Sequence, residues 1–170
     1  VLFRSPLTYE KGKLTTACTR GNGVEGDTVT QNLLHIEGLP KNLLGPSVPE
    51  LIEIRGEIYM SHEEFERINE EREQRNLPLY ANPRNLAAGT VKLLDPKEAK
   101  QRKLEIALYG LGACQPENHF TTLSEFHEAL LQWKAPAVEY FRKVSHAQDA
   151  WRSIMELNEL RHGYGYPTDG

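Results

Sequence analysis

The chain lacks any apolar run near the roughly 18 residues that a membrane helix needs, and no signal-peptide pattern is present. Cys18 and Cys114 have no second cysteine at zinc or redox spacing, so two reduced, buried thiols are expected. The six histidines never form the His-Glu-x-x-His pattern of a zinc helix. These absences predict a soluble, cytoplasmic protein without a metal centre built from these residues.

Excess positive charge is lacking too, since 20 Lys and Arg stand against 24 Asp and Glu, for a net charge of -4. Nucleic-acid-binding modules usually carry a clustered excess of Lys and Arg that neutralises phosphates. The charge argues against a strongly basic module, although a fragment of a larger protein can keep a few cations at one cleft. The 170 residues, 39% of them hydrophobic, predict a single domain with one core.

Periodicity and turn signals predict a mixed α and β chain with largely antiparallel pairing. Apolar and charged residues alternate from Leu51 to Met60, which predicts a strand with one charged face. Ser61 and Glu64 have capping-box spacing, and Asn82 before Pro83 predicts another helix start. Further predicted elements are a hairpin around residues 10–13, a helix from Thr28 towards Ile36 capped by Asp27, and an interior strand at 104–110. Two later helices are predicted at 123–133 and 147–160, the second with Ala147, Ala150, Trp151 and Ile154 at helical spacing and ended by Gly163 and Gly165.

The segment from Arg20 to Gly26 contains the letters of a dinucleotide-binding fingerprint. The strand before it is too polar for a central parallel strand, and the next helix is too short for a crossover, so we reject that assignment. The glycines instead permit a tight turn that brings Arg20 to a bound ligand, with a plain surface loop as the alternative.

Three other positions are candidate site residues, each with a structural alternative. Glu57 follows Gly56, a residue type that often marks close approach of a ligand or backbone, yet its strand face could simply hold cross-strand ion pairs. Arg84, in the first turn of its helix, could bind a phosphate or lie in solvent. Tyr109 could stack on a purine or belong to the core.

Five segments, taken in order, closely resemble the successive blocks of bacterial NAD-dependent DNA ligases. The most specific is Ala81 to Gly89, with the letters Ala-Asn-Pro-Arg-Asn-Leu-Ala-Ala-Gly. The others are Thr19 to Gly23, Glu53 to Ile58, Tyr109 to Gly112, and Arg161 to Gly170. The similarity runs from about Leu7 to Gly170.

The resemblance implies an α+β fold of the covalent nucleotidyltransferase, or ATP-grasp-like ligase, type, with antiparallel sheets flanked by helices. It also implies the reaction: a lysine in a Lys-x-Asp-Gly motif attacks the α-phosphate of NAD, AMP passes to the 5′ phosphate of a nick, and the 3′ hydroxyl displaces it. Such enzymes act in DNA replication and repair with Mg²⁺ or Mn²⁺, and cations offset charge developing on phosphate oxygens.

The resemblance also implies roles for individual residues. Arg20, Glu57 and Tyr109 match positions that contact the adenylate, with Glu57 near the ribose or the water shell of the metal and Tyr109 stacked on adenine. Asp169 opens the Asp-Gly block and, like Glu57, would serve the nucleotidyl steps. Three cations, Arg84, Lys92 and Arg161, match basic positions associated with the AMP phosphate and the backbone of nicked double-stranded DNA.

Departures from the family pattern predict a partial adenylation domain over residues 1–170 that is inactive alone. The resemblance implies a monomer that works together with other domains of the same ligase. By family spacing the nucleophilic lysine would lie about two residues before Val1, and residues 1–6 do not match the expected strand, which suggests foreign or erroneous sequence. Zinc would belong only to a domain outside this chain.

Two rival functions remain at this stage. Another covalent nucleotidyltransferase, such as an ATP-dependent or RNA ligase, generally lacks the block from Ala81 to Gly89. A non-catalytic adenylate- or DNA-binding module descended from a ligase would lack the upstream lysine. The upstream coding sequence would therefore distinguish the binding module from the enzyme.

Overall fold

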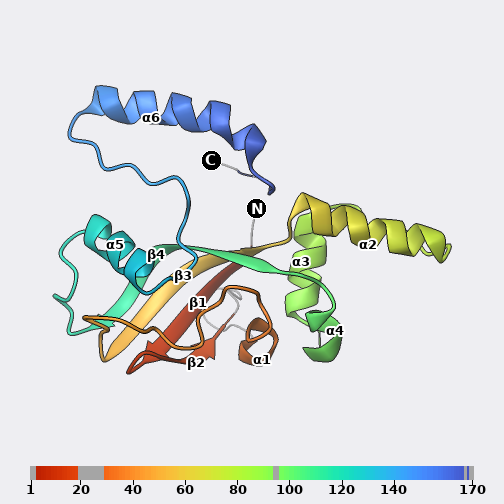
Figure 1. The fold of residues 1–170 in the computed structure, drawn as a ribbon, viewed down its shortest axis with the longest axis horizontal. Helices are drawn as coiled ribbons and strands as arrows, with labels where there is room; N and C mark the ends of the chain where they lie inside the picture. The colour runs from red at the N-terminus through yellow and green to blue at the C-terminus, as the bar shows by residue number, and fades with distance from the viewer. Residues whose placement is uncertain (1–2, 19–28, 94–95, 167, 169–170) are drawn as a thin grey trace.

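Four antiparallel strands form one sheet in the order β2-β1-β3-β4 (Figure 1). The computed structural model describes residues 3–18, 29–93, 96–166 and 168. The strands are β1 (Phe3–Glu10), β2 (Lys13–Ala17), β3 (Leu51–Tyr59) and β4 (Glu105–Gln115). Together with the helices described below they confirm the predicted α+β class and the antiparallel pairing. Residues 3–6 continue β1 and pair with β3.

The predicted hairpin joins β1 to β2. Its two central residues, Lys11 and Gly12, have φ of 48° and 79°, the left-handed conformation that a two-residue hairpin turn requires. A Cβ at Gly12 would also lie 2.9 Å from the carbonyl oxygen of Leu43. Glycine therefore satisfies both the turn geometry and the close approach of the chain.

The two faces of β3 differ in burial, as the alternation of its sequence predicts. Ile52, Ile54 and Ile58 are fully buried. On this face the sheet packs against short helix α1 (Thr30–Leu33) and helices α3 (Pro83–Val91) and α5 (Leu123–Gln132), which supply core residues such as Leu33, Leu86 and Phe126. The polar face, with Glu57, lies opposite α6 (Ala147–Leu160).

Side chains cap the first turns of helices α3 and α5. Asn82 accepts a hydrogen bond from the backbone N–H of Asn85 at 2.8 Å, which confirms the predicted start of α3. Thr122 and Glu125 form a complete capping box at α5, a feature that the sequence analysis missed. Side-chain caps therefore fix the first turns of both α3 and α5.

The capping box predicted for α2 (His62–Gln74) is only half formed, so that prediction needs correction. Ser61 Oγ accepts from the N–H of Glu64 at 3.3 Å. The Glu64 carboxylate does not return to Ser61 but accepts two 2.7 Å bonds from Arg67 and one of 3.0 Å from the N–H of Lys103. An arginine one turn further along competes successfully for the carboxylate.

Several predicted boundaries differ from the structure. The helix expected from Thr28 towards Ile36 is shorter, and Val29 stands at its N-cap without a side-chain cap; Asp27 and Thr28 lie outside the described residues. Strand β4 continues to Gln115 and is an edge strand of the sheet, so the prediction of an interior strand was wrong. The short helix α4 (Pro96–Lys100) was not predicted. Of the two free cysteines, Cys114 is buried as expected, whereas Cys18 is only half-buried.

Helix α6 has the predicted bounds but not the burial that its apolar spacing suggests. It is followed by a single 3-10 turn, η1 (Arg161–Gly163). No residue of α6 is buried, and Trp151 and Ile154 are 65% and 56% exposed. Figure 1 shows α6 (blue) set apart from the other helices and across from the sheet. Its apolar stripe therefore lies outside the main core.

Candidate functional site

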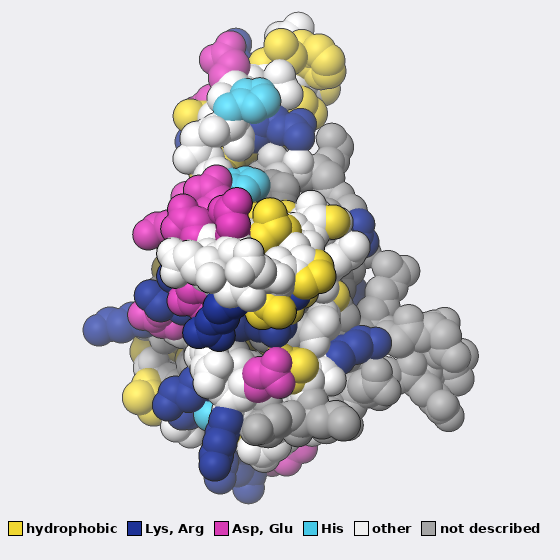
Figure 2. Space-filling model, turned by 90° about the vertical axis from the view of Figure 1, so that its right-hand side faces the viewer, with side chains coloured by type: hydrophobic (Ala, Val, Ile, Leu, Met, Phe, Trp, Pro, Cys, Tyr) yellow, Lys and Arg dark blue, Asp and Glu magenta, His cyan; other side chains and the backbone are white. Residues whose placement is uncertain are grey.

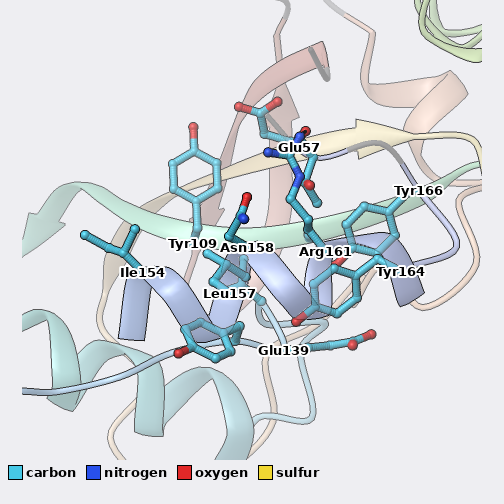
Figure 3. A pocket seen from close by; sticks show the side chains of 13 residues that line it. Glu57, Tyr109, Glu139, Ile154, Leu157, Asn158, Arg161, Tyr164 and Tyr166 are labelled. Carbon is cyan, nitrogen blue, oxygen red and sulfur yellow. Dashed lines mark hydrogen bonds between the residues drawn. The ribbon is translucent and has the colours of Figure 1, made fainter. Parts of the chain in front are cut away.

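A cavity of about 600 Å³ separates α6 from the polar face of β3 and β4 (Figure 3). Its volume falls in the range of about 300–1,000 Å³ that is common for small-molecule sites. The sheet contributes Glu57, Ala107 and Tyr109, and the opposite wall is Ile154, Leu157, Asn158 and Arg161 from α6 and η1; residues 138–140, Tyr164, Tyr166 and Thr168 complete the lining. Three of the predicted site residues, Glu57, Tyr109 and Arg161, thus share one cavity.

Successive side chains of β3 point to opposite faces of the sheet, so Glu57 faces the cavity and Gly56 faces the core. A Cβ at Gly56 would lie 2.7 Å from Cδ2 of Leu108, so the close approach is made by a core side chain. The suggestion that this glycine marks approach of a ligand or backbone was therefore wrong. On the polar face, Glu53 pairs with Arg55 at 3.6 Å along the same strand, while Glu57 lines the cavity.

Tyr109 occupies an irregular point of β4. Arg55 pairs with Gly110 and Gly56 with Leu108, so Tyr109 is an extra residue on β4, as in a β-bulge. Bulges bend a strand and re-aim side chains, and they are frequent beside active sites. Tyr109 is half-buried at the cavity wall, which rules out the core alternative for its ring.

The outer edge of β4 is covered beside Tyr109. The N–H of Leu108 donates to the carbonyl of Pro136 at 2.8 Å, and the N–H of Val138 donates to the carbonyl of Leu108 at 3.0 Å. Residues 136–138 therefore run along this edge, and Val138 and Glu139 join the cavity lining. The hydroxyl of Tyr140 next lies 2.8 Å from the Ser153 carbonyl oxygen and 2.8 Å from the Glu156 carboxylate, which links the same segment to α6.

Arg161 lies where α6 passes into η1, and its side chain extends toward β3 in Figure 3. Its Nη2 donates to the carbonyl of Thr168 at 2.7 Å. The N–H of His62 also donates to the carbonyl of Gly165 at 2.8 Å. These two bonds hold the segment after η1 against the start of α2, so that Thr168 lines the same cavity.

A tyrosine cluster that the sequence analysis missed fixes this segment on the sheet. The rings of Tyr59 and Tyr166 lie 4.5 Å apart, and those of Tyr166 and Tyr164 stack at 5.4 Å. Tyr59 donates to the Glu105 carboxylate at 3.0 Å. Burial, together with Glu105, raises the pKa of Tyr59, and burial raises the pKa of Tyr166, so both phenols stay neutral. The Tyr-Gly-Tyr spacing after η1 was the available signal.

Arg84 and Lys92 do not line the cavity, and both lie on or directly after α3 as exposed side chains. The interval from Arg75 to Lys103 contains seven Lys and Arg but only two Asp and Glu, although the whole chain is acidic. Figure 2 faces the side of the molecule with α2 to α4 and shows dark-blue cations in its lower half. Charge is thus segregated, and a local cationic surface exists despite the net charge.

Arg20 and Asp169 lie outside the described residues, so of the four residues that the resemblance assigns to the adenylate or the nucleotidyl steps, Glu57 and Tyr109 can be placed. Among the residues that the structure describes, no three His, Cys, Asp or Glu side chains form a group that could hold a metal ion. Within the same residues, no helix combines the length and apolarity that crossing a membrane requires.

Comparison with known proteins decides the family. Residues 5–170 match the family described as NAD-dependent DNA ligase adenylation domain. The chain belongs to this family. The resemblance inferred from the sequence blocks is therefore confirmed, and the rival assignment to another kind of nucleotidyltransferase is not favoured.

Curated relatives of this adenylation-domain chain are named as DNA ligases. It is 51% identical over 168 residues to "DNA ligase 1" of Opitutus terrae, with 96% of this chain and 25% of that protein covered. It is 53% identical over 170 residues to "DNA ligase" of Desulforudis audaxviator, and 39% identical over 165 residues to "DNA ligase" of Thermodesulfovibrio yellowstonii; each covers 96% of this chain and 24% of the relative. The chain spans about a quarter of the length of these curated relatives.

Proposed function

We propose that this chain is the nucleotide-binding part of an NAD-dependent DNA ligase and that the cavity between α6 and the sheet binds the adenylate. Membership of the adenylation-domain family supports the reaction class. One observation supports this location: Glu57, Tyr109 and Arg161 come from three different elements and line the same cavity. The proposal includes the finer fold assignment, a covalent nucleotidyltransferase of ATP-grasp-like type, and a partial adenylation domain over residues 1–170.

The lining suits a nucleotide because it combines aromatic and apolar surface with few charged groups. Tyr109 offers a ring face on which adenine stacks, an interaction available to any base with a π-face. Glu57 pairs with Ala107, two residues before Tyr109 on β4, and so offers acceptors for the ribose hydroxyls on the same wall. Adenine at Tyr109 and ribose toward Glu57 would direct the phosphate along the cavity.

Arg161 is the cation of the lining that we assign to the phosphate, because its guanidinium can hold an anion through two parallel N–H donors. Bound NAD supplies an α-phosphate whose bond to nicotinamide mononucleotide breaks when a lysine amine attacks it. That lysine is expected upstream in the full-length protein. Arg20 and Asp169 keep their roles as predictions from the family pattern.

The full-length protein would act on nicked double-stranded DNA together with its other domains. We assign Arg84 and Lys92 to its phosphate backbone because both are exposed on the cationic interval from Arg75 to Lys103. Mg²⁺ or Mn²⁺ remains an expectation of the family. Among the described residues, no three His, Cys, Asp or Glu side chains lie together in a way that would hold this ion.

The experiment that tests this function uses the full-length ligase that contains this chain, incubated with NAD labelled in its adenylate. We expect a covalent label on the protein, reduced strongly in Glu57→Gln. Glu53→Gln is the matched control, because it lies on the same strand face, pairs with Arg55 and does not line the cavity. Absence of label on the unsubstituted protein would refute the function, and equal label in the two variants would refute the site.

A further inference from the structure

Asn32 holds the backbone on both sides of Lys92, although the two residues lie far apart in the sequence. Its side-chain Nδ2 donates to the carbonyl oxygens of Val91 and Leu93, each at 2.7 Å. The Val91 carbonyl belongs to the peptide group directly before Lys92, the C-cap residue of α3, and the Leu93 carbonyl belongs to the next residue along the chain. A single side chain thus holds the backbone of the residues before and after a cation.

The chemistry of this contact requires the amide of asparagine. The –NH₂ group carries two hydrogens, and two carbonyl oxygens use both of them. Carbonyl partners fix which end of the carboxamide faces α3, since its oxygen cannot donate. An aspartate of the same shape would place negative charge against two carbonyl oxygens at the carboxyl end of a helix, where negative charge is already unfavourable.

Asn32 is itself anchored to the sheet. Its helix α1 begins at Thr30, whose Oγ1 accepts from the N–H of Ala17, at the end of β2, at 2.9 Å. The N–H of Val29 also donates to the carbonyl of Ala17 at 2.9 Å. The contact therefore runs from the sheet through α1 to the end of α3.

The same helix end is also held by contacts that do not involve Asn32. Thr90 is fully buried, donates to the Leu86 carbonyl at 2.7 Å and accepts from Arg102 at 3.0 Å. Val91 is fully buried in the core. The last turn of α3 therefore has its own packing, and what Asn32 adds is a fixed backbone at the residues on either side of Lys92.

We infer that Asn32 is a positioning residue that sets the base of the Lys92 side chain, so that its ammonium meets a phosphate of the nicked DNA. The inference rests on the proposed function, because it takes Lys92 as a DNA-phosphate contact. A lysine has a long, flexible stem, so fixing its backbone decides which part of the surface the ammonium reaches. Asn32 touches no substrate and acts through Lys92 alone.

The test measures binding of nicked duplex DNA by the full-length ligase at several salt concentrations, in a cycle of Asn32→Ala, Lys92→Gln and the double variant. Gln31→Ala, exposed on the same helix, is the matched control. We expect Asn32→Ala to raise Kd by about 5-fold alone and by less than about 2-fold in the Lys92→Gln background, the signature of coupled residues. Each single variant should lower the salt slope by up to about 0.9, as loss of one phosphate contact does.

A purely structural role gives a different result. Asn32→Ala would then raise Kd equally in both backgrounds, and this outcome overturns the inference. Asn32→Asp keeps the shape of the side chain but removes its N–H donors. It should raise Kd at least as much as Asn32→Ala does, and near-normal binding by Asn32→Asp contradicts the inference. Unchanged binding by Lys92→Gln overturns it together with the DNA role of Lys92, while the adenylate label from NAD tests the ligase function separately.

Discussion

Replacement of Glu64 by glutamine should loosen α2 from the start of β4 in a pH-dependent way. The Glu64 side chain is 4% exposed and accepts two bonds from Arg67 and one from the N–H of Lys103. In Glu64→Gln one oxygen remains for Lys103, while the new –NH₂ faces an arginine donor. The substitution therefore removes the charge-assisted pair and keeps the shape of the side chain.

The size of the effect follows from the exposure of the partner. Hydrogen bonds to charged groups contribute about 1.5–3 kcal/mol. Arg67 is 41% exposed and keeps Glu71 as a second partner, so the lower end applies. We expect a loss of about 1.5–2 kcal/mol in local stability, which corresponds to roughly 10–30-fold faster amide exchange.

The assay is hydrogen exchange read by mass spectrometry on peptides that cover α2 and Lys103. Glu63→Gln is the control, because Glu63 lies in the same first turn but is exposed. Burial raises the pKa of Glu64, but its hydrogen bonds to Arg67 and Lys103 outweigh this, and the net pKa is lowered from the ordinary 4.5. The carboxylate thus stabilises the fold above pH 4.5, and this contribution is lost as pH falls through the lowered pKa.

The difference in exchange between the unsubstituted chain and Glu64→Gln should accordingly persist at pH 4.5 and close at lower pH. Equal exchange of the two chains at pH 7 would refute the argument. So would a difference that stays constant through the acid range, since a packing defect does not titrate.

Two further predictions concern the cavity and the core beneath it. Tyr109→Ala should raise KM for NAD in the full-length ligase by about 5–150-fold, since base stacking contributes about 1–3 kcal/mol, whereas Tyr109→Phe should stay within about twofold; an unchanged KM in the alanine variant contradicts the stack. Gly56→Ala should destabilise β3 by about 1–3 kcal/mol, the usual cost of overpacking, because its Cβ would lie 2.7 Å from a Leu108 methyl carbon. Exchange of β3 amides measures this, and unaltered exchange would show that Leu108 moves aside freely.

Local signals predicted the elements that depend on a few neighbouring residues. Asn82 before Pro83 placed the start of α3 correctly, because the cap and the proline act within one turn. The alternation through Ile52, Ile54 and Ile58 likewise predicted which face of β3 is buried. Such features need no knowledge of the rest of the fold.

Features that depend on distant partners were beyond the sequence pattern. Glu64 has capping-box spacing, but Lys103, 39 residues later, takes one of its oxygens. Tyr109 lies in an apolar stretch where an aromatic residue is usually part of the core. Only the pairing of β4 with β3 shows that it belongs to a bulge at a cavity. The assignment of Glu57 and Tyr109 to one adenylate site came from the family resemblance, because the number of residues between two positions does not show how close they lie in space.

The segment along β4 has a second consequence. A strand edge offers unpaired N–H and carbonyl groups to which another molecule can add, and aggregation often begins there. Residues 136–138 occupy these groups at Leu108 and also form part of the cavity wall. A substitution that detaches this segment should therefore cost solubility and ligand binding together, so surveys of inactive variants should record aggregation before any loss is attributed to catalysis.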